Sequence, residues 1–309
     1  MKVIHSPSEI IPGPGGVCLA MGVFDGLHFG HQRVIGQACE DAKKIGAVSV
    51  VVTFDRHPNT VIAPQHAPPF IYPPSKKLAV IADLGVDTTC VIHFDALFSQ
   101  MPGEQFVRAL TRPDNIVRSI SVGESFKFGH QRSGDVALLE KLGQELAYAL
   151  HALPDVCLDG QAVSSTRIRE AVRLGQLELA GQLLGRVYTL CGTVVAGAQV
   201  GRQLGFPTAN LNATGALVPP AGVYAANALV QGKTYRAAVN IGHRPTVYAS
   251  QEGLGVEAHL LDFDGNIYGQ EIELTFLAKL RDEARFSSLA ALQQQIKRDV
   301  AAARRTPDP

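Results

Sequence analysis

Paired cysteines are missing from this sequence. Its 309 residues contain five cysteines at scattered positions with no C-x-x-C spacing: Cys18, Cys39, Cys90, Cys157 and Cys191. A disulfide framework or a cysteine zinc site needs paired spacings, so neither is indicated. We therefore expect free thiols and a reducing compartment, the cytoplasm.

An excess of either charge is also missing. Lysine and arginine together number 28, as do aspartate and glutamate, so the formal net charge is zero. A protein that binds a phosphate backbone needs a basic surface that displaces counterions. A nucleic-acid partner is therefore not expected.

Long apolar runs are the third absence. The chain begins MKVIHSPSEIIPGPGG, with prolines and glycines where a signal peptide needs an unbroken apolar stretch. No later stretch approaches the apolar length of a membrane span, so no membrane partner is expected. The composition, with 46% hydrophobic and 18% charged residues, is typical of a globular protein. The length of 309 residues suggests two domains.

The first part of the chain alternates short apolar runs with longer amphipathic segments. The apolar runs are rich in branched residues and bounded by Gly, Asp or Pro, which predicts strands at residues 17–24, 48–54, 88–94 and 116–122. Apolar residues recur between them with helical spacing, which predicts helices at residues 32–44, 75–84, 103–110 and 136–146. This alternation is typical of an α/β fold with a parallel sheet.

The second part of the chain has a different pattern. Alternating segments separated by Gly and Pro turns predict strands at residues 188–195, 223–230, 235–241, 255–261 and 271–277. One amphipathic helix is expected near the end, at residues 288–303. We expect an antiparallel sheet or barrel here, and we place the boundary so that the domains are residues 1–184 and 185–309.

Residues 22–31, GVFDGLHFGH, follow the first predicted strand and open the first predicted helix. A helix N-terminus presents free N–H groups and the positive end of the helix dipole, which favours bound phosphate. His28 and His31 share a face of the first turn, where two imidazoles can stabilise charge on phosphoryl oxygens. The alternative is that these histidines only cap the helix or lie on a polar surface.

A second segment with phosphate-binding side chains is VSSTRIR, residues 163–169. It precedes an amphipathic helix predicted at residues 168–173. Its hydroxyls can cap that helix, while Ser165, Thr166 and the arginines reach phosphate oxygens. The alternative is an N-cap followed by ordinary surface arginines.

Together, F-D-G-x-H-x-G-H and S-S-T-x-I-R resemble the adenylyl-transferring nucleotidyltransferase family, in particular the N-terminal module of bacterial riboflavin kinase/FAD synthetase. Residues 52–58 and 122–129 resemble that module as well. The resemblance implies a Rossmann-like parallel sheet on which the phosphate of FMN attacks the α-phosphate of ATP, giving FAD and pyrophosphate.

The resemblance also assigns residues to this reaction. Catalytic roles are implied for His28 and His31, and ATP contacts for Gly22, Phe24, Asp25, Gly26, Ser164, Ser165, Thr166, Arg167 and Arg169. FMN is implied to lie against His57, Pro58, Ser125, Phe126 and Phe128. Two places depart from the family pattern on the flavin side, because Ser125 replaces Asn or Asp and Asp55-Arg56 replaces Glu-Pro.

In the second domain, residues 201–211 read GRQLGFPTANL. Thr208 and Asn210 are two apart on an extended segment, so they face the same side, and both carry oxygen ligands suited to Mg²⁺. The alternative is a structural turn held by the Thr or Asn side chain.

This segment and residues 222–225, 239–246, 256–263 and 268–283 closely resemble the riboflavin kinase module, a small antiparallel β-barrel with a C-terminal helix. The resemblance implies that Thr208 and Asn210 hold Mg²⁺ with ATP, and that Glu257 takes the proton of the riboflavin 5′-hydroxyl. ATP contacts are implied for Gly201, Arg202, Gly205, Phe206 and Pro207.

Alternatives stay open in this domain. Glu257 can instead be a strand-edge carboxylate facing water, and Arg281 can contact phosphate or flavin or form a surface salt bridge. The flap over the nucleotide has Ala196 where the family often has histidine.

We therefore expect a bifunctional enzyme that converts riboflavin to FMN and FMN to FAD, using ATP and Mg²⁺, with flavins as substrates and products. One alternative is a kinase with weakened or lost adenylylation, and another is a flavin- or nucleotide-binding regulator without catalysis. Self-association is not predictable from the sequence.

Overall fold

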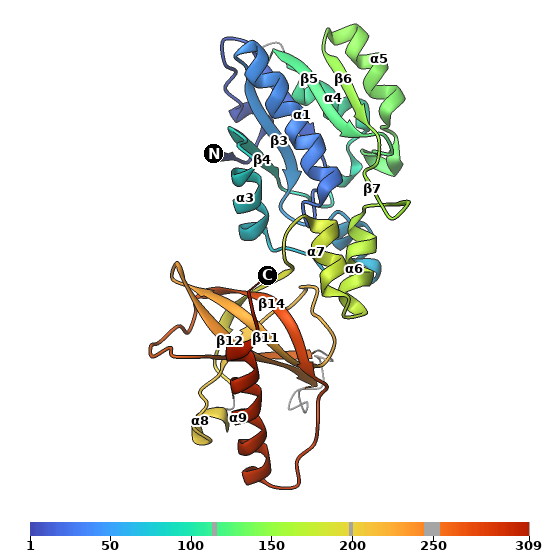
Figure 1. Ribbon diagram of the computed structural model, residues 1–309. Helices are drawn as coiled ribbons and strands as arrows, with labels where there is room; N and C mark the ends of the chain where they lie inside the picture. Colours follow the sequence, from blue (N-terminus) through green and yellow to red (C-terminus); the bar gives the residue numbers. More distant parts are fainter. Residues whose placement is uncertain (113–115, 198–199, 244–253, 309) are drawn as a thin grey trace. The chain divides into compact units, whose positions relative to one another are not determined.

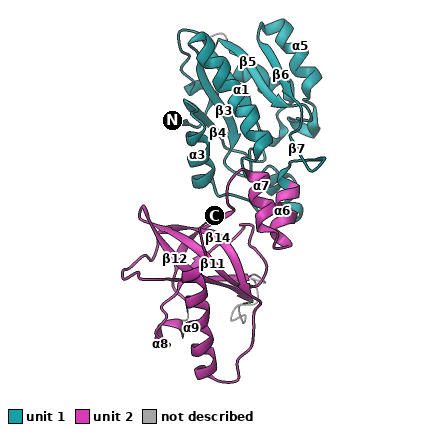
Figure 2. Cartoon of the chain, viewed as in Figure 1, with its two compact units in different colours: residues 1–165 teal, residues 166–309 magenta. Residues whose placement is uncertain are grey.

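The structure is a computed structural model that describes residues 1–308 except 113–115, 198–199 and 244–253, with only the backbone described for Val200 and His243. The chain forms two compact units, residues 1–165 and residues 166–309 (Figure 2), and each is described by itself. Among the described residues, no helix is both long and apolar enough to cross a membrane.

Unit 1 is built on a parallel sheet of six strands in the order β1-β4-β3-β2-β5-β6. The strands are β1 (Lys2–Ile4), β2 (Val17–Met21), β3 (Val48–Phe54), β4 (Thr88–Ile92), β5 (Val117–Gly123) and β6 (Ala149–Leu153). The parallel α/β fold expected for this part of the chain is confirmed.

Helices cover both faces of this sheet (Figure 1). One cluster of buried side chains joins the sheet to α1 (Phe29–Ile45) and α3 (Pro74–Asp83). A second cluster joins it to α4 (Gly103–Leu110) and α5 (Val136–Leu146). Because both faces are buried, the central strands are almost continuously apolar, as in β2, where all five residues are buried.

The strand order has a switch point between β2 and β5. From β2 the chain builds β3 and β4 on one side, and β5 and β6 on the other. The loops that follow β2 and β5 therefore leave the sheet in different directions, and open parallel sheets bind ligands at such a switch point.

Short elements complete unit 1. They are η1 (Pro7–Glu9), α2 (Asn59–Ile62), η2 (Pro64–His66), η3 (Phe98–Gln100), η4 (His130–Arg132) and a hairpin of β7 (Cys157–Leu158) and β8 (Gln161–Ala162). Several of these lie in the loops after β3, β4 and β5, at the carboxyl ends of the parallel strands.

Unit 2 contains a closed antiparallel barrel in the order β10-β13-β12-β11-β14-β9. Its strands are β9 (Thr189–Val195), β10 (Ala209–Asn212), β11 (Gly222–Val230), β12 (Lys233–His243), β13 (Leu254–Leu260) and β14 (Glu271–Arg281). The helices are α6 (Ser165–Arg173), which starts at the last residue of unit 1, then α7 (Leu177–Leu184), α8 (Val200–Gln203) and α9 (Leu289–Arg305). The expected barrel with a terminal helix is confirmed.

The terminal helix packs on the outside of the barrel. Val239, Ile241 and Val256 are fully buried, and the neighbouring residues Asn240 and Glu257 point to the opposite face of their strands. Helix α9 lies against β11, β12 and β14 (Figure 1), so it covers part of that outer face.

Candidate active sites

The two histidines of the first motif lie together at the start of α1. His28 is the N-cap, and its Nδ1 accepts a hydrogen bond from the His31 N–H at 3.4 Å. The two rings stack, with centroids 3.6 Å apart and planes inclined by 22°. His28 therefore does cap the helix, and the same geometry puts both imidazoles at the positive end of the helix dipole.

The loop that carries these histidines has an unusual backbone. Phe24, Gly26 and Leu27 have φ angles of 53°, 79° and 46°, in the left-handed region that side chains rarely adopt. The Phe24 ring is buried and meets the His31 ring edge-on at 5.3 Å. A Cβ on Gly22 would lie 2.8 Å from that Phe24 ring, so glycine is needed there.

Asp25 links this loop to the segment that precedes α3. Its buried carboxylate accepts hydrogen bonds from the N–H groups of Ile71, at 3.0 Å, and Tyr72, at 3.4 Å. The backbone carbonyl of Asp25 accepts a bond from the Ser165 hydroxyl at 2.9 Å. The second motif thus begins in contact with the first, through Ser165.

The second motif is divided between the units, with residues 163–165 in unit 1 and residues 166–169 in unit 2. Helix α6 starts at Ser165, three residues earlier than expected, and Arg169 is buried at 6% exposure. Thr166, Arg167 and Arg169 belong to unit 2, whereas the two histidines belong to unit 1. Their contacts with ATP, and those of Ser164, stay predictions.

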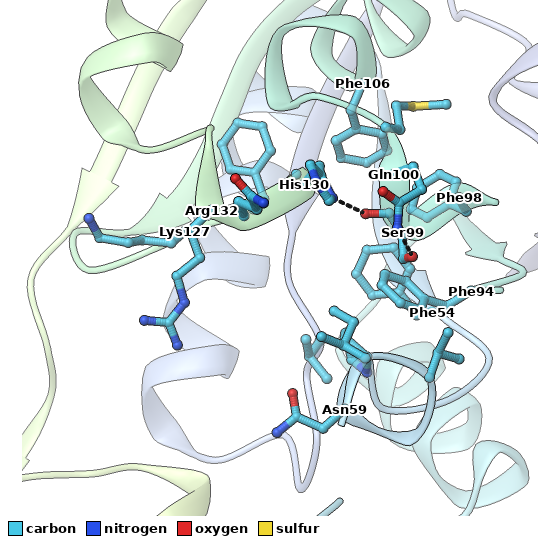
Figure 3. Close-up of a pocket in the computed structure, with 18 of the residues that line it drawn as sticks. Phe54, Asn59, Phe94, Phe98, Ser99, Gln100, Phe106, Lys127, His130 and Arg132 are labelled. Atoms are coloured by element: carbon cyan, nitrogen blue, oxygen red, sulfur yellow. Dashed lines mark hydrogen bonds between the residues drawn. The ribbon is translucent and has the colours of Figure 1, made fainter. Parts of the chain in front are cut away.

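A cavity of about 800 Å³ opens beside this loop in unit 1 (Figure 3). Its wall is dominated by six phenylalanines from the ends of β3, β4 and β5 and from α4: Phe54, Phe94, Phe98, Phe106, Phe126 and Phe128. Neighbouring rings meet mostly edge-to-face, with centroids 5.2 to 6.1 Å apart. Val23, which follows β2, also lines the cavity, so the cavity reaches the histidine-bearing loop.

Lysine, arginine and histidine side chains also line this cavity. Lys127, His130 and Arg132 come from the loop after β5, and the Nδ1 of His130 lies 3.1 Å from the carbonyl oxygen of Ser99 (Figure 3). Aromatic walls with a few basic side chains suit a planar ring system that carries a phosphate.

Four of the five residues expected to contact FMN line this cavity. His57, Pro58, Phe126 and Phe128 line the cavity, whereas Ser125 is exposed and does not. Sequence reasoning missed Phe94, Phe98, Phe106, His130 and Arg132. The signal for Phe94 and Phe98 is their position just after a buried strand, at the ligand-binding edge of a parallel sheet.

The departure at Asp55-Arg56 lies behind the cavity wall. Burial raises the pKa of Asp55, but hydrogen bonds from the Phe94 N–H, Arg56 and His93 outweigh it and lower the pKa overall. The carboxylate lies 2.7 Å from the Nδ1 of His93 and 3.1 Å from Arg56, and it accepts from the Phe94 N–H at 3.0 Å. Asp55 therefore joins the ends of β3 and β4, and neither Asp55 nor Arg56 lines the cavity.

In the barrel, Glu257 lies in a row of directly opposed residues. It faces Asn210 of β10 on one side and Asn240 of β12 on the other. Directly opposed residues in antiparallel strands project from the same face, with Cβ atoms about 5 Å apart. Glu257 and Asn240 line a cavity of about 360 Å³ between the outer face of the barrel and α9.

Thr208 is shared by two cavities. It lines the 360 Å³ cavity with Glu257, and also a second cavity of about 470 Å³ that extends to the loop of residues 263–268. The expected nucleotide residues divide between them. Gly201 and Phe206 line the first cavity, Arg202 and Pro207 line the second, and Gly205 lines neither.

Arg281 is engaged within the protein. Its guanidinium donates to both carboxylate oxygens of Asp299 on α9, at 2.8 to 3.1 Å, and to the carbonyl of Asp282 at 2.8 Å. Asp299 is only 6% exposed, so the pair is more buried than the surface salt bridge expected as the alternative. Both residues line the 360 Å³ cavity, and Asp299 had no signal in the sequence.

Thr208 and Asn210 are the oxygen donors that we expect to hold a cation. No cluster of three or more His, Cys, Asp or Glu suited to a metal occurs among the described residues. Asn210 is 5% exposed and packs against Gly197, where a Cβ would collide with its amide. Thr208 and Asn210 thus supply hydroxyl and amide oxygens, which fit a hard cation that takes its remaining ligands from phosphates and water.

Part of the kinase resemblance lies outside the described residues. These residues are Arg244, Pro245 and Thr246 of the segment 239–246, together with 198–199 of the flap. Ala196 is described and exposed.

Comparison with known proteins matches both units. The FAD synthetase family model matches residues 12–167, and the riboflavin kinase family model matches residues 184–306. The bifunctional riboflavin kinase/FMN adenylyltransferase of Pseudomonas fluorescens is 36% identical over 304 residues, covering 98% of this chain and 97% of that protein. This chain belongs to the bifunctional riboflavin kinase/FMN adenylyltransferase family.

Other members of the family are similarly close. The protein of the same name from Escherichia coli K12 is 36% identical over 306 residues, covering 98% of this chain and 97% of that protein. A crystal structure titled macrolide-efflux protein, from Streptococcus pneumoniae, is 29% identical with a TM-score of 0.81 over 98% of both chains. That title differs from the names of the relatives above, and the TM-score shows that the two chains share a fold.

Proposed function

We propose that this chain makes FAD from riboflavin in two ATP-dependent steps, with the kinase step in the barrel and the adenylyl transfer on the parallel sheet. The two family models support the assignment, because each matches one part of the chain. The observation that carries it is that each unit has its own cavity beside residues suited to phosphate chemistry. All five cysteines are free, which fits the cytoplasmic location that we propose.

In the kinase step, riboflavin occupies the 360 Å³ cavity with its 5′-hydroxyl next to Glu257. The carboxylate takes the hydroxyl proton as the oxygen bonds to the γ-phosphorus of ATP, and the bond to the bridging oxygen breaks to leave ADP. The nucleotide occupies the 470 Å³ cavity, and Thr208 lies on the wall of both. This arrangement lets two substrates meet at one residue.

Thr208 and Asn210 would hold Mg²⁺ against the ATP phosphates. The cation would supply charge neutralisation on the transferred phosphoryl group. The strand pairing has a separate role in this step. It holds Glu257, the proposed base, between Asn210 and Asn240, next to the riboflavin hydroxyl that Glu257 deprotonates.

In the adenylyl step, an oxygen of the FMN phosphate bonds to the α-phosphorus of ATP while the bond to the β-phosphate oxygen breaks. FAD and pyrophosphate are the products, and no protein nucleophile is needed. His28 and His31 donate to phosphate oxygens that gain charge in the transition state, at the positive end of α1. Gly30 lets the chain approach the phosphates closely, because a Cβ there would already lie 3.2 Å from the His28 ring.

FMN occupies the 800 Å³ cavity of unit 1. Its ring system packs among the six phenylalanines, and its phosphate lies toward Lys127, His130 and Arg132. The alternative of a kinase that has lost adenylylation is less well supported, because neither Ser125 nor Arg56 lines this cavity.

The experiment is to incubate the purified chain with riboflavin, ATP and Mg²⁺ and to separate the flavins by chromatography. FMN that is converted to FAD is the expected result. FMN alone would favour the kinase-only alternative, and unchanged riboflavin would contradict both.

A further inference from the structure

Lys77 is a buried lysine that neither proposed reaction uses. It lies on α3 at only 8% exposure, next in the helix to the buried Val80 and Ile81. Lysine is almost never this buried unless its charge has partners, because removing an ammonium group from water costs free energy. The partners of Lys77 therefore indicate what it is for.

The Lys77 ammonium links the end of β3 to the loop that follows β2. Its Nζ donates to the carbonyl of Phe54 at 2.6 Å and to the hydroxyl of Thr53 at 3.3 Å. The Thr53 hydroxyl in turn donates to the carbonyl of Val23 at 3.0 Å. One cation thus connects the last residue of β3 with the loop that follows β2.

Both connected segments reach the proposed adenylyl-transfer site. Phe54 and Val23 line the flavin cavity, and Val23 precedes Phe24, whose ring contacts His31. The bonds from Ile71 and Tyr72 to Asp25, on the same loop, hold the segment just before α3. The segment that precedes α3 is therefore bonded to the histidine-bearing loop through Asp25. Lys77, on α3, bonds in addition to Phe54, which lines the flavin cavity.

We propose that Lys77 is a positioning residue for adenylyl transfer, holding the flavin-side end of β3 and the histidine-bearing loop in the register that aligns the FMN phosphate with the α-phosphate of ATP. The role rests on the proposed adenylyltransferase function. Misplacing reacting groups by about 1 Å can cost about 100-fold in rate, so a buried connection at this point has catalytic consequences without touching substrate.

The charge of Lys77 matters to this role. Burial lowers its pKa to about 8, against the opposing effects of Asp25, on the loop after β2, and Asp55, on the segment after β3. Hydrogen bonds from an ammonium group are roughly twice as strong as those from a neutral amine. The connection therefore weakens as pH rises above about 8.

The test compares Lys77→Met with Lys43→Met, which removes an exposed lysine from α1. We expect Lys77→Met to lower kcat for FMN adenylylation by about 10- to 100-fold, while riboflavin phosphorylation in unit 2 and both activities of the Lys43→Met control stay at the wild-type level. Wild-type adenylylation should fall above pH 8, and Lys77→Arg, whose cation does not titrate, should lose that fall while keeping more activity than Lys77→Met.

Wild-type kcat in folded Lys77→Met would overturn the proposal, as would an unchanged decline above pH 8 in Lys77→Arg. If circular dichroism shows that Lys77→Met does not fold, Thr53→Val decides, because it removes the hydroxyl that links Lys77 to Val23 and leaves the bond from Lys77 to Phe54. A fall in kcat of about tenfold supports the role, and an unchanged kcat contradicts it. Failure of the wild type to make FAD would instead contradict the proposed function.

Discussion

His28 and His31 owe their positions to residues that do not themselves carry out chemistry. The Phe24 ring supports His31, Gly30 leaves room for the His28 ring, and the backbone N–H of His31 bonds to His28. This much of the site follows from the spacing of the motif. The direction of the Asp25 carboxylate does not, because it depends on Ile71 and Tyr72, which are remote in the sequence.

Replacing His31 by alanine should abolish most adenylyl transfer. Loss of one donor to a developing negative charge costs about 100- to 1000-fold in kcat. FMN consumption with ATP measures the effect, and riboflavin phosphorylation by the same preparation is the control. A rate within twofold of the wild type would show that His31 does not act on the phosphates.

Glu257→Gln should stop the kinase step. The amide cannot take the proton of the riboflavin hydroxyl, and loss of a general base costs about 100- to 10,000-fold. Glutamine has nearly the same size and shape as glutamate and keeps the same place in the strand pairing, so the fold should persist. Phosphorylation that proceeds at the wild-type rate would instead favour the alternative of a strand-edge carboxylate without a catalytic role.

Lys77 should have opposite effects on stability and on activity as pH rises. Its pKa is about 8 in the folded protein and 10.5 unperturbed, so in that window the unfolded chain binds the proton more tightly. The free energy of unfolding of the wild type should therefore rise relative to Lys77→Met between pH 8 and 10.5. Urea unfolding at two pH values checks this, and a constant difference between the two proteins would contradict it.

At the scale of elements, periodicity predicted the long segments well. Strand β3 and helices α4 and α5 begin and end at the predicted residues, and α1 extends three residues beyond the prediction at its start. Five of the described strands were not predicted. Strands β1, β7, β8 and β10 are only two to four residues long, and β6 has exposed or half-buried side chains, so none shows a long apolar run.

The barrel strands also show what a sequence cannot give. Alternation identified β12 and β13, but only the register places Asn240 next to Glu257. The wall that α9 contributes to the 360 Å³ cavity of unit 2 depends on tertiary packing. The six phenylalanines that line the 800 Å³ cavity of unit 1 come from segments far apart in the sequence.

The Arg281–Asp299 pair fastens α9 to β14, and its loss should affect both stability and riboflavin binding. Asp299→Ala leaves a largely buried guanidinium without its carboxylate, which should cost about 3 kcal/mol. The KM for riboflavin should rise, because Leu292 and Ile296 of α9 line the same cavity. Thermal unfolding and riboflavin kinetics measure the two effects, with Asp262→Ala as an exposed control, since Asp262 pairs with Arg304 of the same helix. Equal effects of the two variants would contradict a role specific to this pair.

At the scale of the whole molecule, two divisions of the chain can be compared. Compactness divides it after Ser165, whereas the two family models match residues 12–167 and 184–306 and leave most of α6 and most of α7 to neither. The boundary between residues 184 and 185 stays a prediction. Family membership and both folds followed from the motifs, because each motif lies in the fold that its chemistry requires.

The central claim is that two separate sites act one after the other, and one measurement tests it most directly. Wild type, Glu257→Gln and His31→Ala are each incubated with ATP and Mg²⁺ and with riboflavin or FMN, and the flavins are separated by chromatography. Glu257→Gln should leave riboflavin unchanged but convert FMN to FAD, and His31→Ala should stop at FMN. Loss of both activities in either folded variant would contradict the account.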